Sequence, residues 1–286
     1  MTGSTKPFLD RLRSAGTGSW ALNLFLVAVG LLMLAPFYWV VVTSVLPQGE
    51  AFSLPPTWLP TNVNLVNFSK VFDLIPFGSM VLNSFKITAI ITVGSLITSS
   101  LAAYAFARLE FPGRDLLFVV FLSALMIPPQ VTVIPVFILV RTFGLIDTHA
   151  AVYLPALVQV LGIFLLRQWF RSIPRDLEDA AKVDGAGHMR ILAQIILPLS
   201  GPALSAVAIF VAQLYWNDFF WPNIMLSSPE KMTIPVGLVA LQGYQGGAPA
   251  VVIFAAISMI TVPLFVLFIF AQKPITERMA MTGLRG

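Results

Sequence analysis

The chain has 286 residues, of which 57% are hydrophobic and only 10% charged, and its formal net charge is +4. Soluble domains carry about a quarter charged residues, so this composition indicates an integral membrane protein. Cysteine is absent, which excludes disulfides, thiolate nucleophiles and cysteine metal sites. No basic patch is dense enough for a nucleic-acid surface.

The N-terminal region has three basic residues before an apolar run from Trp20 to about Leu46. The run is too long for a signal peptide, and no small-residue cleavage site follows it. We therefore expect an uncleaved first transmembrane helix.

A helix needs about 20 apolar residues to cross the hydrocarbon. Six stretches qualify, which predicts an all-α protein with six transmembrane helices: 21–44, 84–107, 116–140, 151–170, 202–225 and 250–271. Pro128, Pro129 and Pro135 interrupt the third stretch. Because such breaks free backbone carbonyls, this segment is expected to face protein rather than lipid.

Lysine and arginine predict the orientation, because cytoplasmic loops are enriched in them. One set of loops holds most of these residues: Lys6, Arg11, Arg13, Arg108, Arg114, Arg167, Arg171, Arg175, Lys182, Arg190, Lys273, Arg278 and Arg285. The opposite set holds Lys70, Arg141 and Lys231, with Lys86 near a boundary. Both termini are then cytoplasmic. Residues 171–199 form the longest cytoplasmic loop, and residues 226–249 form an extracytoplasmic loop with a Gly-rich tip.

The residue pattern of the cytoplasmic loop predicts a helix, a turn and a second helix. Pro174 suits a first helical turn, and acidic residues after it favour the positive end of the helix dipole. Leu177, Ala180 and Ala181 are spaced to share one face. Gly185 is placed as a C-terminal cap, and an apolar second helix follows up to Pro198. The open alternative is an ordinary loop that obeys the positive-inside rule.

This loop resembles the signature of inner-membrane permeases of binding-protein-dependent ABC importers. The matching residues are Asp179-Ala180-Ala181, Gly185, Ile195 and Leu197-Pro198, with Asp179 where the family usually has glutamate. Glu178 is a second candidate for that role. The segment WNDFFWP (Trp216 to Pro222) and the PEKMTIPVGL run resemble the sugar branch, in particular the maltose-type second permease. The resemblance covers nearly the whole chain, and we expect a single transmembrane permease domain, residues 1–286.

The resemblance implies several partners: a second homologous permease, two ATPase subunits that carry the ATP and Mg²⁺, an extracytoplasmic solute-binding protein and a sugar. It implies that the loop is a coupling helix docked on the ATPase, with contacts from Glu178, Asp179, Ala180, Ala181, Asp184, Gly185, Ile195, Leu197 and Pro198. It also implies that the outer loop reaches the binding protein through Gln242, Gly243, Tyr244, Gln245 and Gly246. No cofactor or metal is expected on this chain.

Catalytic motifs are missing from the sequence. There is no Gly-Lys pair, hence no Walker A phosphate loop, and no hydrolase or zinc-protease motif. His149 and His188 fall in loops on opposite sides, which suits surface histidines. Ionisable groups are scarce inside the predicted spans, which weighs against the alternative of a gradient-driven secondary transporter. A membrane enzyme or scaffold is a second alternative, and the lack of a clustered catalytic set argues against the enzyme.

The fifth stretch carries amides and aromatics near its outer end. Gln213, Trp216, Asn217 and Asp218 are the candidate substrate path, because amides pair with hydroxyls and aromatic faces cover sugar rings. Two alternatives stay open: the tryptophans can form an interfacial belt, and Gln213 and Asn217 can hydrogen-bond between helices.

Overall fold

The computed structural model describes residues 17–243 and 247–261, and every regular element in those ranges is a helix. The predicted all-α class is confirmed. The described residues divide into two compact units, and the single permease domain expected from the sequence stays a prediction. Of the described residues, 17–71 and 248–261 form the first unit, and 72–243 together with Gly247 form the second.

The first unit contains the predicted N-terminal helix. Helix α2 (Thr17–Ser44) is apolar and includes a candidate membrane span, Leu22–Ser44. Helix α3 (Val66–Leu74) is attached to its end by Asn67, whose Nδ2 donates to the carbonyls of Ser44 and Leu46 at 3.0 and 2.8 Å. An apolar helix, Ala250–Thr261, completes this unit, and the rest of the sixth predicted stretch lies outside the described residues.

The second unit is built around the 32-residue helix α4 (Phe77–Arg108). Four helices pack on it: α7 (His149–Ala156), α8 (Val160–Ser172), α12 (Gly201–Trp216) and α14 (Ile234–Gly243). Small residues bring α4 and α8 together, since a Cβ on Gly162 would lie 2.8 Å from the Ser99 hydroxyl. Close approach through small residues is the usual packing of membrane helices.

The third predicted span is broken where its prolines lie. Helix α5 (Arg114–Ser123) and the 3₁₀ turn η1 (Ala124–Met126) are followed by α6 (Pro129–Thr142), and the two halves bend by 101°. The break falls at Pro128-Pro129, because neither residue has an N–H to continue the helix. Pro135 is accommodated inside α6.

A second break separates α7 from α8, within the predicted stretch 151–170. Here side chains of α4 donate hydrogen bonds to carbonyls that the break leaves without helical partners. Thr98 donates to the carbonyl of Leu157 at 2.5 Å, and Ser99 to that of Gln159 at 3.4 Å. Freed carbonyls in a membrane helix need such partners.

The fifth predicted span also departs from a straight helix. The segment His188–Leu199 meets α12 at 81°, and after Trp216 the chain breaks before α13 (Phe220–Met225). The predicted extracytoplasmic loop is not all irregular: it contains the 3₁₀ turn η3 (Pro229–Lys231) and α14. Among the described helices, three are long and apolar enough to cross a membrane, or five if each bent pair counts once. The six-span count and the cytoplasmic termini stay predictions.

Candidate functional site

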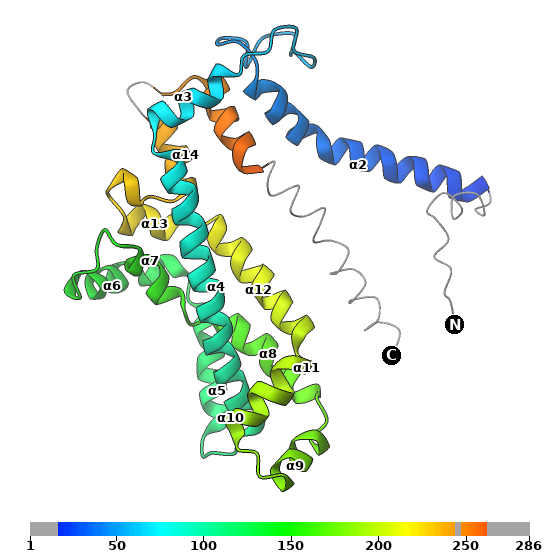
Figure 1. Cartoon of the computed structure of the whole chain (residues 1–286), viewed down its shortest axis with the longest axis vertical. Coiled ribbons are helices and arrows are strands. Elements are labelled where there is room, and N and C mark those ends of the chain that lie inside the picture. The colour runs from blue at the N-terminus through cyan, green and yellow to red at the C-terminus, as the bar shows by residue number, and fades with distance from the viewer. Residues whose placement is uncertain (1–16, 244–246, 262–286) are drawn as a thin grey trace. The chain divides into compact units, whose positions relative to one another are not determined.

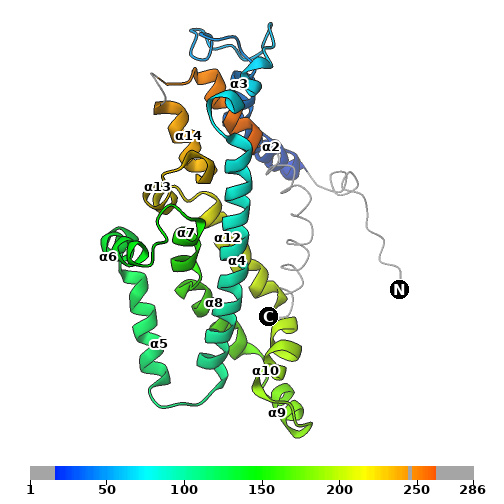
Figure 2. The same ribbon diagram turned by 60° about the vertical axis from the view of Figure 1, so that its left-hand side comes forward.

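The predicted helix–turn–helix is present at one end of α4, at the bottom of Figures 1 and 2. Helix α9 (Asp176–Val183) is followed by Gly185, whose φ of +79° is the left-handed conformation that favours glycine. A second helical segment then runs through α10 (His188–Ile191), a π-helical turn (Leu192–Ile196) and α11 (Leu197–Leu199). Gly185 faces open space, so a side chain there meets strain rather than a clash.

Helix α9 presents one face outward and one inward. Leu177 and Val183 are 45% and 89% exposed, and Ala180 lies with them on the outward face. Ala181 is half-buried against the core instead. The sequence grouped Ala181 with Ala180, but the structure places it beside the inward-facing Glu178, three positions earlier.

Glu178 is not on the outward face of α9. Its carboxylate Oε1 lies 2.7 Å from Nε of Arg108, and the two side chains are 5% and 4% exposed. Asp179 is exposed and pairs with Lys182 on the same helix at 2.9 Å; this hydrogen bond lowers the pKa of Asp179. Of the two acidic candidates, only Asp179 is accessible to a partner in this structure.

The second half of the loop anchors it. Ile191, Leu192 and Ile196 are buried in the main hydrophobic core, and the signature residues Ile195 and Leu197 are half-buried. Pro198, Asp184 and Gly185 are exposed. The signature therefore combines an accessible segment, 177–185, with an apolar anchor.

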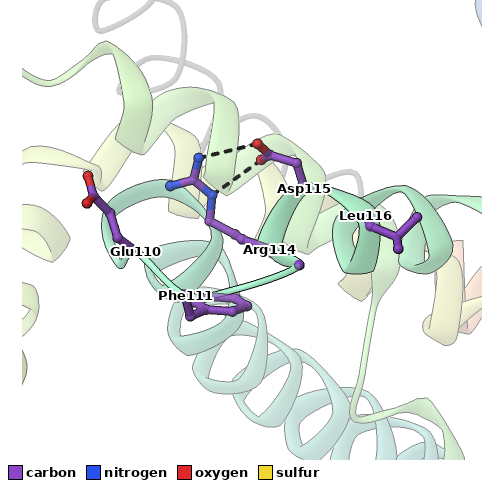
Figure 3. Close-up of a pocket in the computed structure, with 6 residues that line it drawn as sticks. Glu110, Phe111, Arg114, Asp115 and Leu116 are labelled. Atoms are coloured by element: carbon purple, nitrogen blue, oxygen red, sulfur yellow. Dashed lines mark hydrogen bonds and ion pairs between the residues drawn. The ribbon is translucent and has the colours of Figure 1, made fainter.

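Beside this loop, the turn between α4 and α5 contains a second group of charges. Figure 3 shows Arg114 directed at Asp115, with Glu110, Phe111 and Leu116 around a shallow pocket of about 350 Å³. The buried Arg167 of α8 donates to the carbonyl of Phe106 and to Asp115, at 3.1 and 3.3 Å. These contacts fix the ends of α4, α5 and α8 to one another without touching α9.

Three of the four candidate substrate-path residues line one cavity, and Trp216 does not. Gln213, Asn217 and Asp218 line a cavity of about 610 Å³ together with four apolar residues: Phe210, Leu214, Phe219 and Phe220. Asp218 Oδ1 accepts the N–H of Phe220 at 3.0 Å, which caps α13. Asn217 Nδ2 donates to the carbonyl of Gln213 within its own helix.

The aromatic residues of this region separate into two groups. Trp216 is half-buried and is not among the cavity-lining residues, and Trp221 packs on the main core. Sequence reasoning missed Gln159, which lies at the α7–α8 break and donates to the hydroxyl of Tyr215 at 2.6 Å. An amide flanking a break in an apolar stretch was the signal that could have pointed to it.

At the opposite end of α4, the segment 226–234 is held by many polar contacts. Asp147, with φ of +58°, accepts the backbone N–H groups of Ser227 and Ser228 and an ammonium hydrogen of Lys231. These bonds, that from Lys231 above all, hold the pKa of Asp147 well below its usual range.

Side chains of α4 and α7 hold the same segment. Asn83 donates to the carbonyls of Glu230 and Met232, and Ser84 accepts from Ile234. His149 Nε2 lies 3.0 Å from the carbonyl of Lys231, so this histidine contacts the segment 226–234, while His188 lies next to Tyr104 at the other end of α4.

The tip of the outer loop is described only in part. Gln242 and Gly243 are exposed at the end of α14, and Tyr244, Gln245 and Gly246 lie outside the described residues. Gly247 has a φ of +87°, and a Cβ on it would lie 3.0 Å from the carbonyl oxygen of Gln242.

Comparison with known proteins identifies a family model and several relatives that match this chain. Residues 94–280 match the family model described as a binding-protein-dependent transport system inner membrane component. Similar proteins include an arabinooligosaccharides transport system permease protein, AraQ, of Halalkalibacterium halodurans, 33% identical over 94% of this chain and 97% of its own. The trehalose/maltose transport system permease protein MalG of Thermococcus litoralis is 32% identical over 91% and 94%.

A further relative and a solved structure agree on the fold. The sn-glycerol-3-phosphate transport system permease protein UgpE of Yersinia pestis is 32% identical over 88% of this chain and 92% of its own. A chain of a bacterial ABC transporter that imports the acidic polysaccharide alginate superposes with a TM-score of 0.79, at 23% identity, over 95% of this chain and 99% of that one. The protein described here belongs to the family of inner membrane components of binding-protein-dependent transport systems, and is a multi-pass membrane permease rather than an enzyme.

Proposed function

We propose that this chain is a permease subunit of an ATP-driven sugar importer. Relatives named as permeases for arabinooligosaccharides and for trehalose and maltose cover nearly all of its length. In this proposal it forms half of a translocation path with a second, homologous permease. A solute-binding protein delivers the sugar outside, and two ATPase subunits carry ATP and Mg²⁺ inside.

The proposal that this chain couples to the ATPase subunits rests on the outward face of α9. Leu177, Ala180 and Val183 expose apolar surface on a short helix that also carries Asp179 and is followed by Asp184. Exposed apolar surface next to charges, on a segment too polar for lipid, suits a protein partner. Gly185 and the buried residues of α10 and the π turn hold this face in place. We assign it to the ATPase contact.

The cavity at the end of α12 supports a sugar rather than an ion as the transported solute. Gln213, Asn217 and Asp218 offer hydrogen-bonding groups, and the rings of Phe210, Phe219 and Phe220 offer apolar surface. This mixture of few polar groups and aromatic faces is typical of carbohydrate sites.

A charge reversal on α9 tests the assignment. Asp179→Lys places a cation on the outward face, where Asp179 is 62% exposed, so it leaves membrane insertion unchanged. We expect the ATPase subunit to be lost from membranes and sugar uptake to fall with it. Glu110→Lys is the matched control, because Glu110 is an exposed carboxylate on the neighbouring α4–α5 turn.

The same experiment separates the proposed importer from a transporter that works alone. The purified chain is expected to hydrolyse no ATP, because it lacks a phosphate loop. If Asp179→Lys retains the ATPase and uptake, or if the chain alone supports uptake in vesicles driven by an ion gradient, the coupling assignment fails.

A further inference from the structure

One arginine connects three helical elements at the cytoplasmic end of the second unit. Arg108 is the last residue of α4. Its Nη2 donates to the carbonyls of Phe170 and Ile173 at the end of α8, the latter at 2.6 Å. Its Nε lies 2.7 Å from the carboxylate of Glu178 in α9. A cation at the C-terminal ends of two helices is also favoured by their dipoles.

Glu178 is the inward-facing charge of α9. Asp176, Asp179 and Lys182, the other charged residues of that helix, are exposed. The inward contacts of α9 therefore combine a small apolar residue, Ala181, with one buried carboxylate. Leu177 and Ala180, on the outward face, are left for a partner.

The Arg108–Glu178 pair is a close contact between two buried charges. Removing one partner leaves the other charge buried without compensation, so separating the two side chains is costly. Apolar packing, by contrast, tolerates small sliding of one element against another. The ion pair is therefore better suited than the packing of Ala181 to transmit a displacement of α9 to α4 and α8.

We propose that the Arg108–Glu178 ion pair transmits the movement of α9 to the membrane helices α4 and α8. The proposal rests on the proposed function, since it takes α9 as the segment moved by the ATPase. It assigns Arg108 and Glu178 as positioning residues that contact neither sugar nor nucleotide, and it separates them from the outward residues that dock.

The test is the number of sugar molecules imported per ATP hydrolysed, measured with the full complex in proteoliposomes. Glu178→Gln keeps the shape of the side chain and removes its charge, while the outward face of α9 is unchanged. We expect the ATPase subunit to stay bound and to hydrolyse ATP, and the ratio to fall at least fivefold, the lower range of typical coupling between sites.

Arg167→Gln is the matched control. Arg167 is the other buried arginine at this end, and it binds Phe106 and Asp115 but does not contact α9. If its loss only destabilises the helix ends, the amount of complex falls and the ratio stays. A ratio that falls equally in Arg167→Gln and Glu178→Gln would overturn the proposal, because general loosening would then explain both.

A double variant covers the case in which Glu178→Gln does not accumulate. Arg108→Met with Glu178→Leu removes both charges and fills the space, a replacement that buried ion pairs often tolerate. A stable complex with a lowered ratio supports the proposal. A wild-type ratio in either variant, or release of the ATPase from Glu178→Gln, overturns it. Release of the ATPase subunit would show that the ion pair only holds the docking face in position. If α9 is not a docking surface at all, that failure appears in a different variant, because Asp179→Lys then retains the ATPase subunit.

Discussion

The two ends of α4 are held by different kinds of contact. At one end, the segment 226–234 is attached through Asp147, Asn83, Ser84, His149 and Lys231, with bonds distributed over several backbone groups. At the opposite end, α9 is joined to α4 by one buried ion pair, and most of its remaining surface is exposed. An element with many shared bonds behaves as a fixed platform, because losing one bond leaves the others in place. An element joined through one ion pair depends on that pair for its position against α4.

The largest effect is expected at the turn after α9. Gly185→Val places a β-branched residue at a φ of +79°, at a cost of about 1–3 kcal/mol. Because nothing lies near the new side chain, the strain should shift α9 rather than prevent insertion. We expect uptake to fall strongly while the subunit stays in the membrane.

Gly187→Val is the control for that prediction. Gly187 has a φ of −76° and also faces open space, so valine fits there without backbone strain. Equal loss of uptake in both variants would mean that bulk in the loop, and not the left-handed turn, is what matters.

Trimming the predicted outer loop tests the end of α4 that is held to segment 226–234 by several bonds. Removal of Gln242 to Gly247 leaves Asp147, Lys231 and their contacts intact, so the complex should assemble. If the tip reaches the binding protein, binding-protein-stimulated ATP hydrolysis and uptake should drop several-fold. Normal uptake by the shortened chain would make the tip a simple connector.

Smaller effects are expected from the cavity at the end of α12. Replacing Gln213 or Asn217 with alanine removes one hydrogen-bonding group each, worth about 0.5–1.5 kcal/mol, or roughly twofold to tenfold in apparent affinity. Asn223→Ala is the comparison, since Asn223 is an exposed amide of α13 that does not line the cavity. If uptake by both cavity variants depends on sugar concentration as it does in the wild type, these residues do not belong to the substrate path.

The smallest effect is expected from Asp147→Asn. The amide can still accept the bonds from Ser227 and Ser228 but loses the ion pair with Lys231, so we expect a slightly lower melting temperature in detergent and near-normal uptake. The pKa of Asp147 is depressed by folding, so its stabilising effect is present at neutral pH and disappears only as the pH falls below about 4, the ordinary aspartate value. A thermal-shift series from pH 7 to 3 checks this, with a smaller acid-induced loss in Asp147→Asn.

Local rules were enough to predict the helix–turn–helix from sequence. Pro174, the acids after it, Gly185 and the apolar spacing of 191–196 each act within a few residues, so their meaning does not depend on the rest of the chain. The hydrophobic stretches likewise predicted where apolar helices lie, and the prolines marked the break at 128–129. The break after Leu157 was not predicted, because the Thr98 and Ser99 hydroxyls that satisfy its carbonyls come from a helix about 60 residues earlier in the chain.

The sequence by itself determined the membrane class, the positions of the apolar helices and the signature loop, because burial in lipid and turn chemistry are local demands on composition. Only the tertiary structure decided the roles of individual residues. Glu178 and Asp179 are adjacent and carry the same charge, yet one is buried against Arg108 and the other is exposed. Arg108 and Glu178 are separated by 70 positions in the sequence. Their pairing depends on α8 placing α9 beside the end of α4, which no local pattern records.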